Sequence, residues 1–119
     1  MTDLQKIHET FCWYFDIDDK WMIFKKTNRL YETEKRHLFF VISYEVTKKS
    51  CETIGKYPLE GTNNFWDHSS ITHSKKRIYG LIKTDKELNN DYECIKALCR
   101  EHNKYKANTI VKYIFENKD

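Results

Sequence analysis

Residues 66–78 read WDHSSITHSKKRI, and this stretch combines a helix start with a cluster of positive charge. Asp67 or Asn64 can cap the free backbone N–H groups at the start of a helix, because short polar side chains accept hydrogen bonds from them. One helical face then carries residues three or four apart, namely Ile71, Ser74, Ile78 and Ile82. The other faces carry His68, Ser69, Thr72, Lys75 and Lys76. A helix with a polar tip and a cationic body fits a DNA groove, and equally fits an ordinary solvated surface.

The whole chain has the composition of one packed helical domain. It has 119 residues, of which 39% are hydrophobic and 15% aromatic, and this is enough for one core. Only 3 Gly and 1 Pro are present, so few turns are signalled, and long runs with helical spacing lie between them. We therefore expect an all-α single domain.

Several classes of protein and site are disfavoured. No apolar run approaches the ~20 residues of a membrane span, and the N-terminal MTDLQKIHETF lacks the pattern of a signal peptide. The four cysteines form no C-x-x-C pair, which indicates free thiols in a reducing compartment. The His and Cys spacing matches no zinc site, and nothing pairs a nucleophile with an orienting base. We expect a cytoplasmic protein, in a bacterial cell or an infected host, that is not an enzyme and has no metal, cofactor or membrane partner.

Positive charge is concentrated in the middle of the chain. Residues 20–83 carry 13 Lys and Arg against 6 Asp and Glu, a net +7, whereas the whole chain has a net charge of only +3. Residues 1–19 carry 1 against 5, and residues 84–119 carry 7 against 7. Such a basic block is typical of phosphate binding, although Lys and Arg also keep helical surfaces soluble.

Apolar residues at helical spacing predict six helices and a possible seventh. The expected ranges are 3–15, 20–26, 32–46, 51–57, 67–84 and 86–102, with residues 103–119 as a helical extension packed on a domain formed by residues 1–102. The stretch PLEGTNNFW at 58–66 contains the only Pro and is expected to be a loop. The helix before this loop and the helix after it make a candidate helix-turn-helix, in which the second helix enters the major groove.

Four stretches, in order, resemble the C-terminal DNA-binding domain of the bacterial replication initiator DnaA. They are KKTNR (25–29), EKRHLFFVISYEVT (34–47), SCETIG (50–55) and DHSSITHSKKRI (67–78), and the resemblance covers roughly residues 4–98. It implies a six-helix, Trp-repressor-like fold with a helix-turn-helix that binds short AT-rich boxes in double-stranded DNA. The chain has no phosphate-binding loop of an ATPase module, so we expect a stand-alone domain of a phage or other mobile element, acting in replication initiation or transcription regulation.

The resemblance also implies roles for individual residues. The major-groove readers would be Asp67, His68, Ser69 and Thr72, and Arg36 would enter the adjacent minor groove. Phosphate contacts would come from Lys25, Lys26, Arg29, Lys48, Lys49, Ser70, Lys75 and Lys76. An Asp carboxylate can accept a hydrogen bond from cytosine N4, and Arg suits the narrow minor groove of AT-rich DNA.

The stretch before the helix departs from the family. Trp66, after a longer loop, stands where the family has a Gly-rich turn with Arg, so the implied box sequence does not transfer directly. We expect a monomer or weak dimer. One alternative to DNA binding is a protein-interaction module that keeps the fold and binds a host or phage protein, such as a host replication or defence protein, through the Phe65–Trp66 loop. A third possibility is the binding of structured RNA by the basic helical surface.

Overall fold

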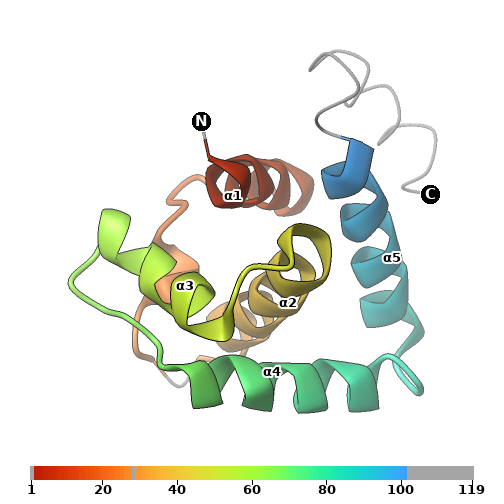
Figure 1. The fold of residues 1–119 in the computed structure, drawn as a ribbon. Helices are drawn as coiled ribbons and strands as arrows, with labels where there is room; N and C mark the ends of the chain where they lie inside the picture. Colours follow the sequence, from red (N-terminus) through yellow and green to blue (C-terminus); the bar gives the residue numbers. More distant parts are fainter. Residues whose placement is uncertain (1, 28, 102–119) are drawn as a thin grey trace.

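Five α-helices and two short 3₁₀ helices form the regular structure of the computed structural model, which describes residues 2–27 and 29–101 (Figure 1). They are α1 (Asp3–Phe15), η1 (Met22–Phe24), α2 (Leu30–Thr47), α3 (Cys51–Lys56), η2 (Tyr57–Glu60), α4 (His68–Leu81) and α5 (Lys86–Glu101). No strand occurs within the described ranges. The expectation of an all-helical fold is confirmed for the part of the chain that the structure describes.

The helix boundaries follow local signals in the sequence. Thr2 accepts from the backbone N–H of Gln5, whose side chain accepts from the N–H of Thr2, and this capping box starts α1 at the expected residue. Ser50 caps α3 at the start of the helix expected at 51–57, because its hydroxyl oxygen accepts from the backbone N–H of Thr53. Helix α2 ends where Lys48 adopts a left-handed backbone with φ of 60°.

Two expected elements differ from the structure. The helix expected at 20–26 is a single 3₁₀ turn at Met22–Phe24. Another 3₁₀ helix, Tyr57–Glu60, includes the last residue of the helix expected at 51–57 and the first residues of the expected loop. Pro58 lies at the start of that turn, where its missing N–H is tolerated. The seventh helix, expected at 103–119, lies outside the described residues.

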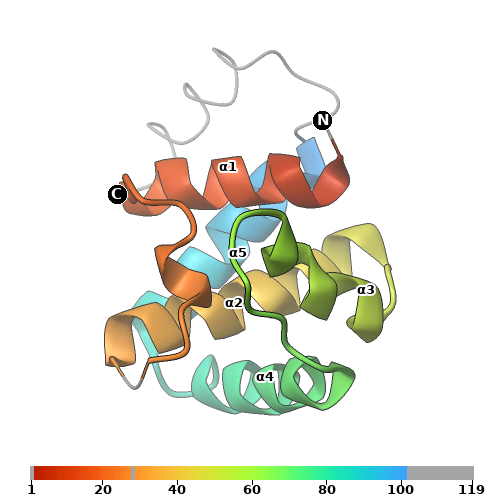
Figure 2. The same ribbon diagram turned by 90° about the vertical axis from the view of Figure 1, so that its left-hand side faces the viewer.

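Helix α2 is the central element of the fold. Figures 1 and 2 both show α2 between α1 and α4, and α5 packs against both α1 and α2. Its middle stretch, residues 38–43, is buried at every position, because neighbours cover it on several sides. This explains the bulky sequence LFFVIS, and it leaves α4 as an outer helix supported from one side.

His8 occupies a buried position in the core. Its Nδ1 lies 2.7 Å from the Tyr57 hydroxyl and its Nε2 lies 2.6 Å from the carbonyl oxygen of Lys20. A carbonyl only accepts, so Nε2 carries the proton and Nδ1 accepts from Tyr57. The rings of Trp21 and Phe24 pack edge-on against the imidazole. Burial lowers the pKa of His8 to about 4, so the side chain is neutral near pH 7.

A polar cluster joins α4 to α2 and α5. Glu45 on α2 accepts hydrogen bonds of 2.6 Å from the hydroxyls of Tyr79 on α4 and Tyr92 on α5. Lys96 on α5 lies 3.5 Å from the same carboxylate. These donors hold the pKa of Glu45 below its ordinary value, against the opposing effect of burial. The cluster fixes the far end of α4, which leaves the position of its first turn to other contacts.

Candidate nucleic-acid interface

Helix α4 begins at a cap made by Asp67. One carboxylate oxygen accepts from the backbone N–H groups of Ser69 at 2.9 Å and Ser70 at 3.2 Å, and also from the Ser69 hydroxyl. Asp67 rather than Asn64 is therefore the N-cap. The hydrogen bond from the Ser69 hydroxyl, followed by those from the backbone, holds the pKa of Asp67 below its ordinary value. The carboxylate is charged at neutral pH, and one of its oxygens is used within the protein.

The outer face of α4 has no acidic side chain. Residues 68–83 contain four Lys or Arg and no Asp or Glu. The exposed positions of the helix are His68, Ser69, Thr72, His73, Lys76, Tyr79 and Gly80. Figures 1 and 2 show this helix along one edge of the molecule, on the side opposite α1. A polar, acid-free helix at an edge is chemically suited to a polyanion.

The inner face of α4 is held on α2. Ile71, Ser74 and Ile78 are buried, and the Ser74 hydroxyl lies 2.6 Å from Nδ1 of His37. Burial lowers the pKa of His37 to about 4, and neighbouring Arg36 adds to this effect. These contacts fix the rotation of α4, so that the polar residues at its tip face outward.

The cations of α4 are not equivalent. The ammonium of Lys75 lies 4.0 Å from the centre of the Tyr44 ring, and Arg77 forms a 3.9 Å ion pair with Glu34. Lys76 is exposed and makes no ion pair within the described part of the chain. Lys76 is therefore the α4 cation most available to an anion.

The other basic residues expected to contact phosphate lie in two connections. Before α2, Lys25 forms an exposed ion pair of 3.6 Å with Asp19, and the exposed Arg29 forms one of 3.7 Å with the buried carboxylate of Glu32. An exposed pair such as that of Lys25 is weak, so a phosphate can replace the carboxylate of Asp19. Lys48 and Lys49 lie between α2 and α3, and Lys48 is exposed.

Trp66 is mostly enclosed rather than presented to solvent. Its backbone N–H donates to the carbonyl of Gly55 at 2.9 Å, and its ring meets that of Phe40 edge-on. A Cβ on Gly55 would lie 1.7 Å from the Trp66 carbonyl oxygen. Glycine is therefore required where α3 approaches the segment before α4. Phe65, by contrast, is 51% exposed.

Arg36 is buried, with 6% of its surface exposed. Its Nη1 donates to the carbonyls of Ile23 at 3.3 Å and Lys25 at 3.2 Å, and its guanidinium lies 4.1 Å from the centre of the Trp66 ring. Two carbonyls and an aromatic face compensate for the burial of the charge. The structure thus places the residue expected to be a minor-groove contact inside the protein.

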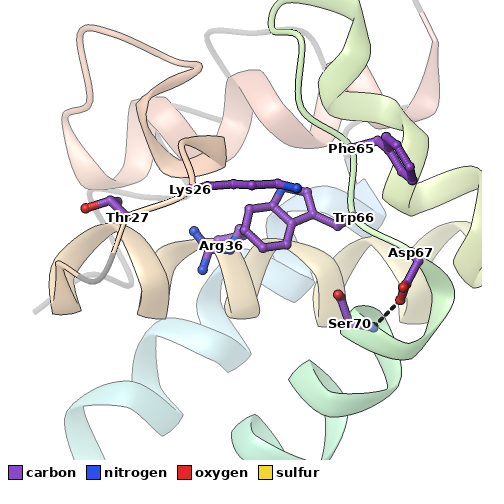
Figure 3. A pocket seen from close by; sticks show the side chains of 7 residues that line it. All are labelled: Lys26, Thr27, Arg36, Phe65, Trp66, Asp67 and Ser70. Atoms are coloured by element: carbon purple, nitrogen blue, oxygen red, sulfur yellow. Dashed lines mark hydrogen bonds between the residues drawn. The ribbon is translucent and has the colours of Figure 1, made fainter.

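An open cleft of about 490 Å³ lies beside the start of α4 (Figure 3). It is lined by Lys26, Thr27, Arg36, Phe65, Trp66, Asp67 and Ser70. The ammonium of Lys26 lies 5.4 Å from the centre of the Trp66 ring. The structure therefore brings Lys26, from the first basic segment, to the tip of α4.

Sequence reasoning missed two residues of this region. His73 is exposed on α4, and Thr27 lines the cleft. The spacing of His73, four residues after Ser69, places it on the same helical face and could have identified it. No local signal identifies Thr27, because its position depends on how the connection before α2 folds back.

Two kinds of site are not found in the described residues. No group of three or more His, Cys, Asp or Glu is placed to hold a metal ion there, and no described helix has the length and apolarity of a membrane span. Comparisons with family models, with curated proteins and with solved structures gave no match to the chain.

Proposed function

We propose that the chain is a sequence-specific double-stranded DNA-binding protein without ATPase activity. In this proposal α3, the segment at 61–67 and α4 act as a helix-turn-helix, and the first two turns of α4 enter the major groove. The observation that carries the proposal is the outer face of α4, which lies at an edge of the molecule and has no acidic residue over positions 68–83. Replication-origin recognition or transcriptional control is the role that fits such an activity.

Within the proposed complex, His68, Ser69 and Thr72 contact base edges, because all three are exposed at the start of α4. Asp67 contributes mainly as the cap, with one oxygen left for a base. Phosphate contacts come from Lys76 and from the exposed members of the two basic connections. We do not assign Arg36 a base contact, because its guanidinium is engaged inside the protein.

The experiment that tests the proposal is a fluorescence-anisotropy titration at two salt concentrations. The probes are an AT-rich initiator-type duplex and a scrambled duplex of the same composition. We expect preferential binding to one duplex, weakened by salt because phosphate contacts release counterions. His68→Ala should lose the preference, whereas Asn90→Ala, at an exposed position on α5, should keep it.

Two other outcomes are informative. Equal, salt-sensitive binding to both duplexes would support DNA binding and refute this target, and selection from random duplexes would then find the preferred site. The absence of binding to either duplex at low salt would refute the proposal.

A protein-interaction module is the second candidate. The exposed ring of Phe65 favours it, because an exposed aromatic side chain is a common anchor for a partner protein. Trp66 does not contribute to such a surface, since its ring packs against Arg36 and Phe40. If Phe65→Ala leaves both the fold and the duplex affinity unchanged, the exposed ring has no role in DNA binding, and this second role gains support.

A further inference from the structure

We infer that Arg36 and Trp66 form a positioning pair, which holds the tip of α4 at a fixed place relative to the basic segment at 25–29 and thereby sets the selectivity of the DNA contact. The inference rests on the proposed function, and it assigns Arg36 a role through Trp66 rather than through DNA. Neither residue has to touch a base for the pair to act.

Arg36 is hydrogen-bonded to the backbone at the start of the basic segment at 25–29. Its Nη1 donates to the carbonyls of Ile23 and Lys25, so the guanidinium fixes the backbone immediately before Lys26. The guanidinium is planar and charged, and each hydrogen bond that it donates to a buried carbonyl is stronger than a neutral one. The position of the segment thus depends on a residue in the second turn of α2.

Arg36 also contacts the segment that leads into α4, through the ring of Trp66. Its guanidinium lies 4.1 Å from the centre of the Trp66 ring, and Trp66 directly precedes the capping residue Asp67. The Trp66 indole N–H is buried and has no hydrogen-bond partner within the described residues. The ring is therefore located by stacking and packing, and the stack with Arg36 is its main polar interaction.

A pair of this kind affects selectivity more than affinity. Phosphate contacts place a protein on DNA, whereas base contacts specify the sequence. If the link between the basic segment and α4 loosens, both the basic segment and α4 can still contact phosphate. The first turn of α4, however, no longer reaches the bases in one fixed register. Selectivity between duplexes falls while salt-dependent, non-specific binding remains.

Three variants test the pair. Arg36→Lys keeps the charge but loses the planar group that stacks and donates in two directions. Trp66→Leu keeps the carbonyl contacts of Arg36 and removes the stack. Arg100→Lys, at an exposed position on α5, is the matched control for the Arg-to-Lys change. Circular dichroism establishes that each variant is folded, and Trp66→Leu still tests the pair if Arg36→Lys does not fold.

The first readout needs no DNA. Hydrogen exchange at the backbone amide of position 66, which donates to the Gly55 carbonyl, should accelerate about tenfold relative to its intrinsic rate in Arg36→Lys and Trp66→Leu, because the segment before α4 loses a support. Amides of α1 and α5 should not change, and Arg100→Lys should behave like the wild type. Unchanged exchange at the amide of position 66 in both variants would overturn the pair, whatever the protein binds.

The second readout is the ratio of affinities for the duplex preferred by the wild type and a scrambled duplex. We expect this ratio to fall about tenfold in both variants, with the salt slope and the affinity for the scrambled duplex preserved. An unchanged ratio would refute the positioning role. An equal loss for both duplexes with a smaller salt slope would also refute it, since Arg36 would then contact phosphate itself. A wild type that binds neither duplex refutes the proposed function, and the exchange readout still decides whether the pair exists.

Discussion

Lowering the pH from 7 to 5 should destabilise the protein through His8. The side chain is 1% exposed, and both ring nitrogens are engaged by neighbours in the neutral form. Its pKa is about 4 in the folded protein, against an ordinary value of 6.5. The unfolded chain therefore takes up a proton first as the pH falls, and the folded state loses stability over the interval between these two pKa values.

The size of the effect follows from the shift in pKa. Each pH unit inside the interval lowers the free energy of unfolding by at most about 1.4 kcal/mol per histidine. Between pH 7 and pH 5 the expected loss from His8 is about 2 kcal/mol, since its titration in the unfolded chain begins near pH 6.5. His37, whose pKa is also about 4, changes stability in the same direction.

The assay is urea unfolding followed by far-UV circular dichroism at pH 7, 6 and 5. The comparison is with His8→Gln, whose amide can donate to the Lys20 carbonyl but does not titrate. The wild type should lose about 2 kcal/mol more than the variant between pH 7 and pH 5. The lower limit of pH 5 matters, because Glu45 and other carboxylates with a lowered pKa lose their stabilisation below about pH 4.5. Equal losses in the two proteins would refute the assignment of His8 as a buried neutral group.

Three further predictions concern the support and the surface of α4. Gly55→Ala should lower the free energy of unfolding by about 3 kcal/mol, because its Cβ would meet the Trp66 carbonyl, whereas Gly80→Ala should raise it by about 0.5 kcal/mol, because its Cβ meets nothing within 4 Å. Thermal melts that rank the two variants in the opposite order would contradict this. Glu45→Gln should destabilise the protein by about 2 kcal/mol in urea, since two tyrosine hydroxyls and an ammonium lose a charged acceptor, and a change below about 0.5 kcal/mol would show the cluster to be unimportant. Lys76→Gln should reduce the slope of log affinity against log salt by about 0.9 without changing the preference between duplexes, and an altered preference would instead indicate a base contact.

Local patterns were sufficient for most of the fold. The spacing of apolar residues predicted the starts of α1, α3 and α4 to within one residue of those in the structure, and Asp67 was one of the two caps expected for α4. The two 3₁₀ turns were not predictable in this way. Residues 22–24 form only one turn, stabilised by burial of Phe24 in the core rather than by a cap, and burial is not a local property.

The candidate site was only partly predictable, for the same reason. The exposed tip of α4 follows from its own sequence, because the cap and the buried face together fix which side chains point outward. The burial of Arg36 cannot be predicted from the sequence of α2, because the residues around Arg36 look like the solvated basic start of an ordinary helix. It depends on Trp66, 30 positions later in the chain, and on two backbone carbonyls before α2.

The structure suggests a different role for Trp66, which stands where the initiator family that the sequence resembles has a Gly-rich turn with Arg. From the sequence, a Trp in place of a Gly-rich turn with Arg suggests the loss of a contact. In the structure its ring packs against Arg36, and Arg36 is thereby engaged inside the protein. The exposed cation that lines the cleft is then Lys26, from the segment before α2. In the proposed complex this leaves base reading to the tip of α4, so the preferred duplex should depend on major-groove contacts rather than on an arginine in the minor groove.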